Sequence, residues 1–185
     1  MNLTLFLTLA SIHIAVVMTP GANFLRVTQN ALAYSRRTGL LTAIGVATGS
    51  GLYVLAGMIG FAAVVSQSPI VYDLIRMVGA VYFVYMGSQL LMRQLRSAEV
   101  DAAASISDLS HREAYRAGLL TAIANPAAAL YFLSLFTTVI PLSSVLTDKI
   151  FAGLLLVTIT LTWYAFIVTT FSNRQVRSFY HHVER

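Results

Sequence analysis

The chain has 185 residues, of which 57% are hydrophobic and 10% are charged, and its net charge is +5. Because an average soluble domain carries about 25% charged residues, this composition excludes an ordinary soluble domain and predicts a polytopic integral membrane protein. The chain contains no cysteine, which excludes disulfides, thiol redox chemistry and cysteine-ligated metals.

We predict an all-α helical bundle of about five membrane spans that forms a single domain over residues 1–185. A span needs roughly 20 mostly apolar residues, and charge-free runs long enough for one recur along the chain. In chain order the predicted spans are Leu3–Asn23, Leu40–Val65, Ile70–Met92, Tyr115–Ile140 and Phe151–Phe171.

The first predicted span contains a helix break at Pro20 and Gly21, followed by Asn23. Proline leaves a helix carbonyl without its N–H donor and lipid supplies no water in its place, so the break requires surrounding protein or a polar cavity. We expect Thr19 to satisfy a carbonyl freed by the break. The half-helix that follows would present free N–H groups suited to a carboxylate. Asn23 would either offer its amide to a zwitterionic solute or cap its own half-helix, and both interpretations stay open.

The first predicted span also carries His13, about ten residues from its start and therefore near the bilayer midplane. An ionisable group at this depth is unfavourable and is a candidate for function. Histidine changes its charge near neutral pH, as proton coupling requires. The alternative is a neutral imidazole that forms hydrogen bonds between helices.

The second predicted span is rich in glycine and contains Ser50. The spacing Gly45-xxx-Gly49 allows close approach of a neighbouring helix, so we favour a packing role for these glycines. The alternative is a glycine-lined passage beside Ser50, which makes this serine a candidate substrate-binding residue.

The third predicted span begins with Asp73 and Arg76, which are spaced to form an ion pair on one helix face or, alternatively, a gate. After this span comes the one long linker, at residues 94–112. It has neither spaced metal ligands nor a phosphate-binding glycine pattern. We expect a solvated cytoplasmic linker between two halves of the bundle.

The fourth predicted span contains a second break, at Asn125 and Pro126. Asn125 has the same two interpretations as Asn23, and Thr121 is expected to satisfy a freed carbonyl. Tyr131 follows one turn after the proline and is the aromatic residue that we expect to face a cavity. Interrupted helices at corresponding positions of two repeated halves point to a substrate site. The candidate binding residues are therefore Asn23, Ser50, Asn125 and Tyr131.

A hexapeptide links the second and fourth predicted spans, because Gly39–Ile44 (GLLTAI) recurs unchanged as Gly118–Ile123. It reflects a common start of both spans at the cytoplasmic face, a coincidence in apolar sequence, or a true repeat. The pairing of the two broken spans is the sounder one. Two inverted halves of three spans each would need a sixth span, and the sequence to Arg185 contains none.

The distribution of basic residues predicts that the amino terminus lies outside and the carboxy-terminal tail lies in the cytoplasm. Of the 12 Lys and Arg residues, all but Arg76 and Lys149 follow the first, third and fifth predicted spans.

The sequence contains no constellation typical of an enzyme. It has no usable serine triad, no paired inward carboxylates, no HExxH motif and no phosphate-binding loop. We therefore expect no catalytic residue, no metal site, no cofactor and no nucleic-acid partner.

Several segments resemble the LysE/RhtB family of amino-acid exporters in their order and spacing. The opening Leu-Phe-Leu-Thr and His13 before Pro20-Gly21 are most similar to the threonine and homoserine efflux branch. The matching segments are His13–Phe24 (HIAVVMTPGANF), the basic turn with Gly39, the glycine-rich second span, Gly79–Gly87 (GAVYFVYMG) and Gly118–Pro126 (GLLTAIANP).

The resemblance implies a multi-pass protein of the plasma (inner) membrane that exports a small neutral or hydroxylated amino acid, such as threonine or homoserine, by proton antiport. Its partners would be the amino-acid substrate, protons and the lipid bilayer, and a homo-oligomer is left open. By position, Pro20, Gly21 and Asn23 match the first family signature, and Asn125 and Pro126 match the second.

The chain departs from the family pattern at three points: the first two concern substrate identity and proton coupling, and the third, the missing final span, supports an alternative function. Members often have lysine where this chain has Ala127, some have an acidic residue where it has Ser50, and most have a final span. The alternative is a non-transporting, truncated member that acts as a membrane partner or regulatory subunit.

Overall fold

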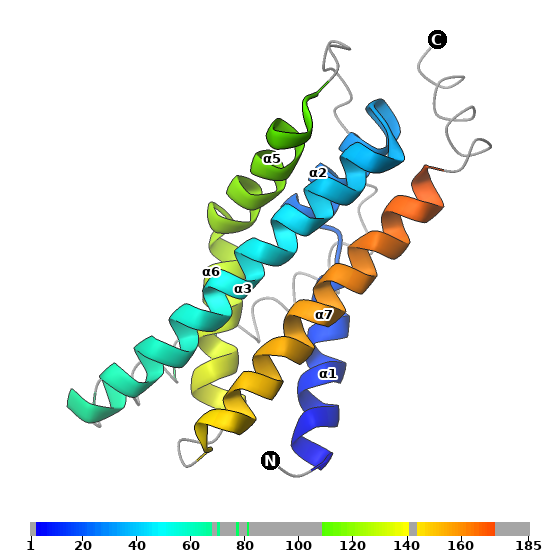
Figure 1. The fold of residues 1–185 in the computed structure, drawn as a ribbon. Helices are drawn as coiled ribbons and strands as arrows, with labels where there is room; N and C mark the ends of the chain where they lie inside the picture. Colours follow the sequence, from blue (N-terminus) through cyan, green and yellow to red (C-terminus); the bar gives the residue numbers. More distant parts are fainter. Residues whose placement is uncertain are drawn as a thin grey trace.

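A computed structural model describes residues 3–67, 109–140 and 144–172, together with Ile70, Met77 and Val81. The described residues form a helical bundle without strands, which confirms the predicted fold class (Figure 1). The helices are α1 (Leu3–Val17), α2 (Ala22–Ala33), α3 (Arg36–Gln67), α5 (His111–Ile123), α6 (Pro126–Ser134), the π-helical turn η1 (Leu135–Val139) that continues α6, and α7 (Leu146–Phe171).

Four of the predicted spans have counterparts in the helices. Residues Arg36–Ile59 of α3 and the whole of α7 are each long and apolar enough to cross a membrane. Two further spans qualify only as bent pairs of helices. The first pair joins α1 to α2 with a bend of 59°, and the second joins α5 to α6 and η1 with a bend of 58°. Most of the third predicted span, with Asp73 and Arg76, and residues 94–108 of the linker lie outside the described residues.

The predicted end of the first span at Asn23 is wrong, because the chain continues as α2 to Ala33. This segment carries several polar residues, but α2 is a two-sided helix. Val27 and Ala31 are fully buried, whereas Arg26 is exposed. Packing of this apolar side against α3, α5 and α7 stabilises a helix that its polar composition disguises.

The start of α5 is fixed by a capping box just before it. Ser110 Oγ accepts the backbone N–H of Glu113 at 3.3 Å, and the Glu113 carboxylate accepts the backbone N–H of Ser110 at 2.9 Å. This reciprocal pair satisfies two helix-terminal donors. The helix therefore begins at His111, within the carboxy-terminal end of the predicted linker.

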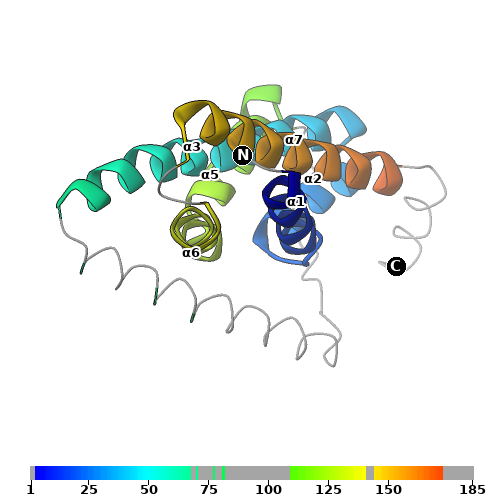
Figure 2. The ribbon, with the colours of Figure 1, turned by 90° about the horizontal axis from the view of Figure 1, so that it is seen from below.

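The two bent pairs run in opposite directions. In Figure 1 the first pair runs from α1 at the lower end to α2 at the upper end, and the second returns from α5 at the upper end to α6 at the lower end. The long helices α3 and α7 lie side by side, and α1 and α6 lie against one face of them (Figure 2). This antiparallel arrangement of the broken spans is the one that inverted halves require.

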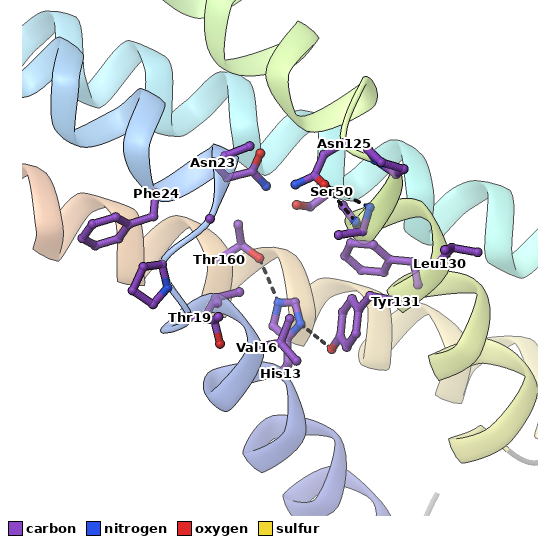
Figure 3. Close-up of a pocket in the computed structure, with 18 of the residues that line it drawn as sticks. His13, Val16, Thr19, Asn23, Phe24, Ser50, Asn125, Leu130, Tyr131 and Thr160 are labelled. Carbon is purple, nitrogen blue, oxygen red and sulfur yellow. Dashed lines mark hydrogen bonds between the residues drawn. The ribbon is translucent and has the colours of Figure 1, made fainter. Parts of the chain in front are cut away.

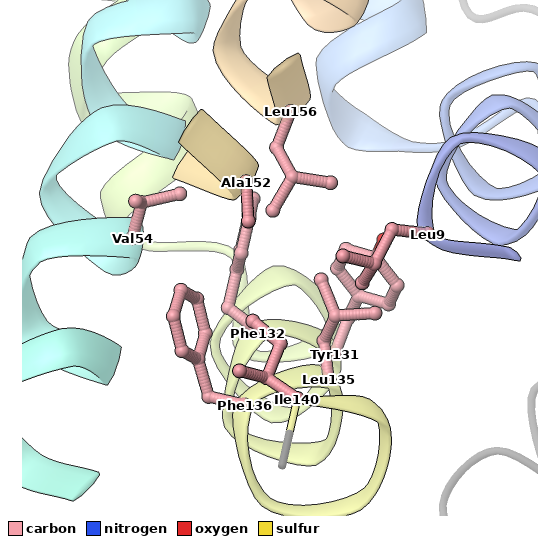
Figure 4. Packing of buried hydrophobic residues seen from close by; sticks show 9 residues of the cluster. All are labelled: Leu9, Val54, Tyr131, Phe132, Leu135, Phe136, Ile140, Ala152 and Leu156. Carbon is pink, nitrogen blue, oxygen red and sulfur yellow. The ribbon is translucent and has the colours of Figure 1, made fainter. Parts of the chain in front are cut away.

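Two apolar clusters form the core, one on each side of the breaks. The α1–α6 cluster (Figure 4) joins α1, α3, α6, η1 and α7, and the α2–α5 cluster joins α2, α3, α5 and α7. The α1–α6 cluster contains Leu9, Val54, Tyr131, Phe132, Leu135, Phe136, Ile140, Ala152 and Leu156, and the α2–α5 cluster contains Val27, Ala31, Ala43, Val46, Ala122, Tyr164 and Val168.

The helices α3 and α5 pack closely through small residues of the repeated hexapeptide and its neighbourhood. A methyl group added at Gly45 would collide with the Tyr115 carbonyl oxygen, and one added at Gly118 would collide with the Thr42 carbonyl oxygen. A methyl group at Gly49 would lie 2.6 Å from Ala122 Cβ. The structure thus confirms the packing role of Gly45 and Gly49, and it places the two hexapeptide copies in a pair of contacting helices.

Candidate functional site

A cavity of about 430 Å³ lies between the two helix breaks (Figure 3). This volume is within the usual range for small-molecule sites. Asp, Glu, Lys and Arg are all absent from its wall among the described residues. The cavity brings together the residues predicted to bind substrate, to couple protons or to break the helices, namely His13, Pro20, Gly21, Asn23, Ser50, Asn125, Pro126 and Tyr131.

The first break satisfies its freed carbonyls with local donors. The backbone N–H of Thr19 donates to the Val16 carbonyl at 3.1 Å, and the Thr19 hydroxyl donates to the Ala15 carbonyl at 2.9 Å. The second bond confirms the predicted role of Thr19. Gly21 then occupies the position before α2 and has no side chain, so the first N–H groups of α2 receive no side-chain cap. This helix end is electropositive and open.

Asn23 does not cap α2, and that interpretation of its amide is wrong. It lies inside the first turn of the helix, beyond the capping position held by Gly21. Its Oδ1 atom is buried and accepts no hydrogen bond. Buried polar atoms in folded proteins almost always have a partner, so this atom needs an explanation. Figure 3 shows the Asn23 side chain at the cavity, opposite Asn125.

Asn125, in contrast, does cap its half-helix. Its Oδ1 accepts the backbone N–H groups of Ala127 at 3.0 Å and Ala128 at 3.4 Å, while Pro126 takes the first helical position. The end of α6 is therefore already occupied by a side chain of the protein. The two breaks look alike in sequence but differ in what they leave open to a ligand.

The Asn125 N–H donates to the Ala122 carbonyl, to which Pro126 cannot donate, and a second freed carbonyl is satisfied by a residue that sequence reasoning missed. Tyr53 on α3 donates its hydroxyl to the Ile123 carbonyl at 2.6 Å, where Thr121 was expected to act. The two residues are 70 positions apart, and no local pattern announces such a contact.

His13 links three helices from the floor of the cavity. It is 1% exposed, and its Nδ1 and Nε2 lie 2.7 Å from Tyr131 Oη and 2.9 Å from Thr160 Oγ1. The Thr160 hydroxyl already donates its single proton to the Leu156 carbonyl at 3.0 Å. Thr160 therefore accepts from Nε2–H, and in a neutral imidazole Nδ1 accepts from the Tyr131 hydroxyl. These contacts fit a neutral imidazole between helices, one of the two interpretations of His13.

Ser50 is buried in α3 and lines the same cavity, next to Asn125 in Figure 3. The α3 glycines are absent from the cavity wall as far as the chain is described. The prediction of a glycine-lined passage is therefore wrong for Gly45 and Gly49, because α5 packs directly against both of them. Thr160 and Tyr164 of α7 also line the cavity, and their places in an otherwise apolar span gave no distinguishing signal.

Comparison with known proteins identifies relatives over nearly the whole chain. A family model described as LysE type translocator matches residues 14–185. The threonine efflux protein of Escherichia coli (strain K12) is 30% identical over 179 residues, which are 96% of this chain and 87% of the relative. The leucine efflux protein of Salmonella choleraesuis (strain SC-B67) is 28% identical over 131 residues, which are 71% of this chain and 61% of the relative. No solved structure matches the chain.

Proposed function

The chain belongs to the LysE type translocator family, and on this premise we propose that it is a secondary exporter of a small neutral or hydroxylated amino acid, such as threonine or homoserine. Members of this family are transporters rather than enzymes. The relatives named above are efflux proteins for threonine and for leucine, both of which have uncharged side chains.

The observation that carries this proposal is the unpartnered Oδ1 of Asn23 beside the uncapped end of α2. An α-amino acid has one charged group suited to each of these two features. Its carboxylate would accept the free N–H groups at the start of α2, where the helix dipole favours negative charge. Its ammonium group would donate to Asn23 Oδ1 and give this buried atom the partner that it lacks.

The remainder of the cavity wall supports a neutral side chain. Asn125 uses its Oδ1 for capping, so only its Nδ2 group is left to donate to a ligand. The Ser50 hydroxyl is suited to a hydroxylated side chain. A charged side chain would find no opposite charge on the described wall, and an unpaired charge in such a site is unfavourable.

His13 is the candidate for coupling export to a proton gradient. A second proton would bind at Nδ1, which now accepts from the Tyr131 hydroxyl. Nδ1 would then become a donor, and the Tyr131 hydroxyl would have to accept and turn its own proton elsewhere. Since Tyr131 lines the cavity, protonation of His13 would change the hydrogen-bonding character of the substrate site. Proton antiport follows if the two ligands favour different arrangements.

The basic residues support an amino terminus outside the cell and a tail in the cytoplasm of a plasma (inner) membrane protein. Arg36 and Arg37 lie at the start of α3, and Arg112 and Arg116 at the start of α5, which are at the same end of the molecule (Figure 1). Lys149 lies at the start of α7, at the opposite end. The positive-inside rule assigns the arginine-rich end to the cytoplasm.

Transport by the purified protein tests the function directly. Proteoliposomes preloaded with unlabelled threonine should accumulate labelled threonine by counterflow, and an imposed pH gradient should drive net accumulation without preloading. Homoserine and leucine should compete, whereas lysine and glutamate should not. Absence of counterflow with all three neutral amino acids, in correctly folded protein, would contradict transport and favour a non-transporting membrane partner.

A further inference from the structure

One aromatic residue outside the cavity contacts both limbs of the second break. Tyr53 donates its hydroxyl to the carbonyl of Ile123, the last residue of α5, at 2.6 Å. Its ring stacks on Phe132 of α6, with ring centroids 5.8 Å apart and planes 15° from parallel. A single side chain of α3 therefore holds the end of one limb and the face of the other.

The hydroxyl of Tyr53 and the cap of Asn125 complete one exchange of hydrogen bonds. In an unbroken helix the Ile123 carbonyl would accept the N–H of residue 127. Here the N–H of Ala127 donates to Asn125 Oδ1, and the Tyr53 hydroxyl donates to the Ile123 carbonyl. Because Asn125 takes the N–H of Ala127, the Ile123 carbonyl loses its helical donor. The Tyr53 hydroxyl replaces that donor, so Asn125 can cap α6 without leaving the Ile123 carbonyl unsatisfied. Lipid would not supply a donor.

The ring contacts extend from Tyr53 to the centre of the cavity. Phe132 lies edge-on to Tyr131 at 5.0 Å between centroids, and its ring is 6.0 Å from that of His13. Phe132 and Tyr131 both line the cavity, whereas Tyr53 does not. A shift of the second break relative to α3 would therefore move the residues that face the ligand.

We propose that Tyr53 is a positioning residue for substrate binding, which acts by fixing the second break and the orientation of Asn125. The inference rests on the proposed transport function. It does not place Tyr53 in contact with substrate. Its hydroxyl fixes the angle between α5 and α6, and its ring fixes the face of α6 that lines the cavity.

Threonine counterflow with single and double variants tests this role. Tyr53→Phe keeps the stacked ring and removes only the donor, so we expect KM to rise about three- to tenfold with Vmax nearly unchanged, as for one hydrogen bond within a membrane. Asn125→Ala should raise KM as well. If Tyr53 acts through Asn125, adding Tyr53→Phe to Asn125→Ala should raise KM no further. Tyr115→Phe, which removes a hydroxyl from α5 outside the cavity, is the matched control and should behave as wild type.

The result that overturns the proposal is a normal KM for Tyr53→Phe, or KM effects that multiply in the double variant while the wild type transports. A measurement independent of transport tests the role of Tyr53 if the wild type does not transport threonine. In Ala128→Cys, which places the only thiol of the chain at the cavity wall, adding Tyr53→Phe should accelerate labelling by a small maleimide several-fold. An unchanged labelling rate overturns the role of Tyr53 even in a protein that moves no threonine.

Discussion

At the scale of single residues, the two asparagines show how position relative to proline decides the role of an amide. Asn125 directly precedes Pro126, and proline at the first helical position makes the preceding residue the cap. Asn23 lies three positions after Pro20, where Gly21 holds the capping position. Its side chain is left with a buried, unpartnered oxygen at the cavity. Asn125 therefore uses its Oδ1 to cap the helix and keeps only Nδ2 for a ligand, whereas the Oδ1 of Asn23 has no partner in the protein.

This contrast predicts different defects for the two alanine variants. Asn125→Ala removes a cap and should lower the free energy of unfolding by about 1 kcal/mol. Asn23→Ala removes an unsatisfied acceptor and should leave stability unchanged or slightly raised, while KM for threonine rises at least about tenfold through loss of a bond to a charged group. Thermal unfolding in detergent and counterflow measure the two effects. Gln29→Ala, which removes an amide of α2 outside the cavity, is the control for Asn23→Ala. Equal stability losses in the two asparagine variants would contradict the assignment of a cap to Asn125 alone.

The second residue-scale prediction concerns His13. His13→Gln keeps an amide able to bond to one neighbour but cannot bind a proton, so threonine counterflow should persist within a few-fold of wild type while the pH gradient no longer drives accumulation. Counterflow and gradient-driven uptake in the same proteoliposomes separate the two properties. Gradient-driven accumulation that survives in His13→Gln would remove this residue from proton coupling.

At the scale of elements, α3 and α5 form the close helix contact that the glycine spacing of the second predicted span indicated. Small residues on both helices let the backbones meet, and the Thr42 hydroxyl shares its proton between the Thr38 carbonyl at 2.9 Å and the Ala114 carbonyl of α5 at 3.2 Å. Asn30 of α2 donates to that same hydroxyl at 2.8 Å. This hydrogen bond thus joins α2, the second half of the first broken span, to α3, and α3 also packs against α5 of the second broken span. Packing and these polar bonds replace the hydrophobic effect, which is weak between helices in lipid.

The glycines of α3 provide a matched test of this contact. Gly45→Ala would drive a methyl group into the Tyr115 carbonyl and should lower the free energy of unfolding by about 1–3 kcal/mol. Gly51→Ala on the same helix meets only Val157 at 3.7 Å, an ordinary contact, so it should be neutral or stabilising by up to about 1 kcal/mol. Equal melting temperatures for the two variants would argue against the tight crossing.

At the scale of the whole molecule, the cavity lies between two packed clusters that belong to opposite ends of the broken spans. The α1–α6 cluster lies on one side and the α2–α5 cluster on the other. Alternating access would require one cluster to loosen while the other stays closed. The bonds from His13 to Tyr131 and Thr160 join α1 to α6 and α7 on the side of the first cluster, so a proton at His13 would act on the packing of that side.

The orientation of the whole chain can be measured because the chain contains no cysteine. Thr147→Cys places a thiol at the start of α7, and His111→Cys places one at the start of α5, at the other end of the molecule. If the arginine-rich end is cytoplasmic, an impermeant maleimide added to intact cells should label position 147 only. Position 111 should react only after the cells are permeabilised, and the reverse pattern would invert the proposed topology.

The sequence by itself determined the class of the protein, the places of the two breaks and the opposite directions of the broken spans. These features are properties of single residues or short windows: the missing N–H of proline, the hydropathy of a run and the position of arginines. The helix α2 was missed because its polar residues outweigh its apolar side until α3 and α7 cover that side.

Only the tertiary structure decided which polar groups meet. His13 bonds to residues 118 and 147 positions away, and Tyr53 bonds to one 70 positions away. Such contacts depend on how far each helix is rotated about its axis, and that rotation is set by the packing of all helices together. For the same reason, the difference between an occupied helix end at Asn125 and an open one at Asn23 emerges only when both breaks face one cavity.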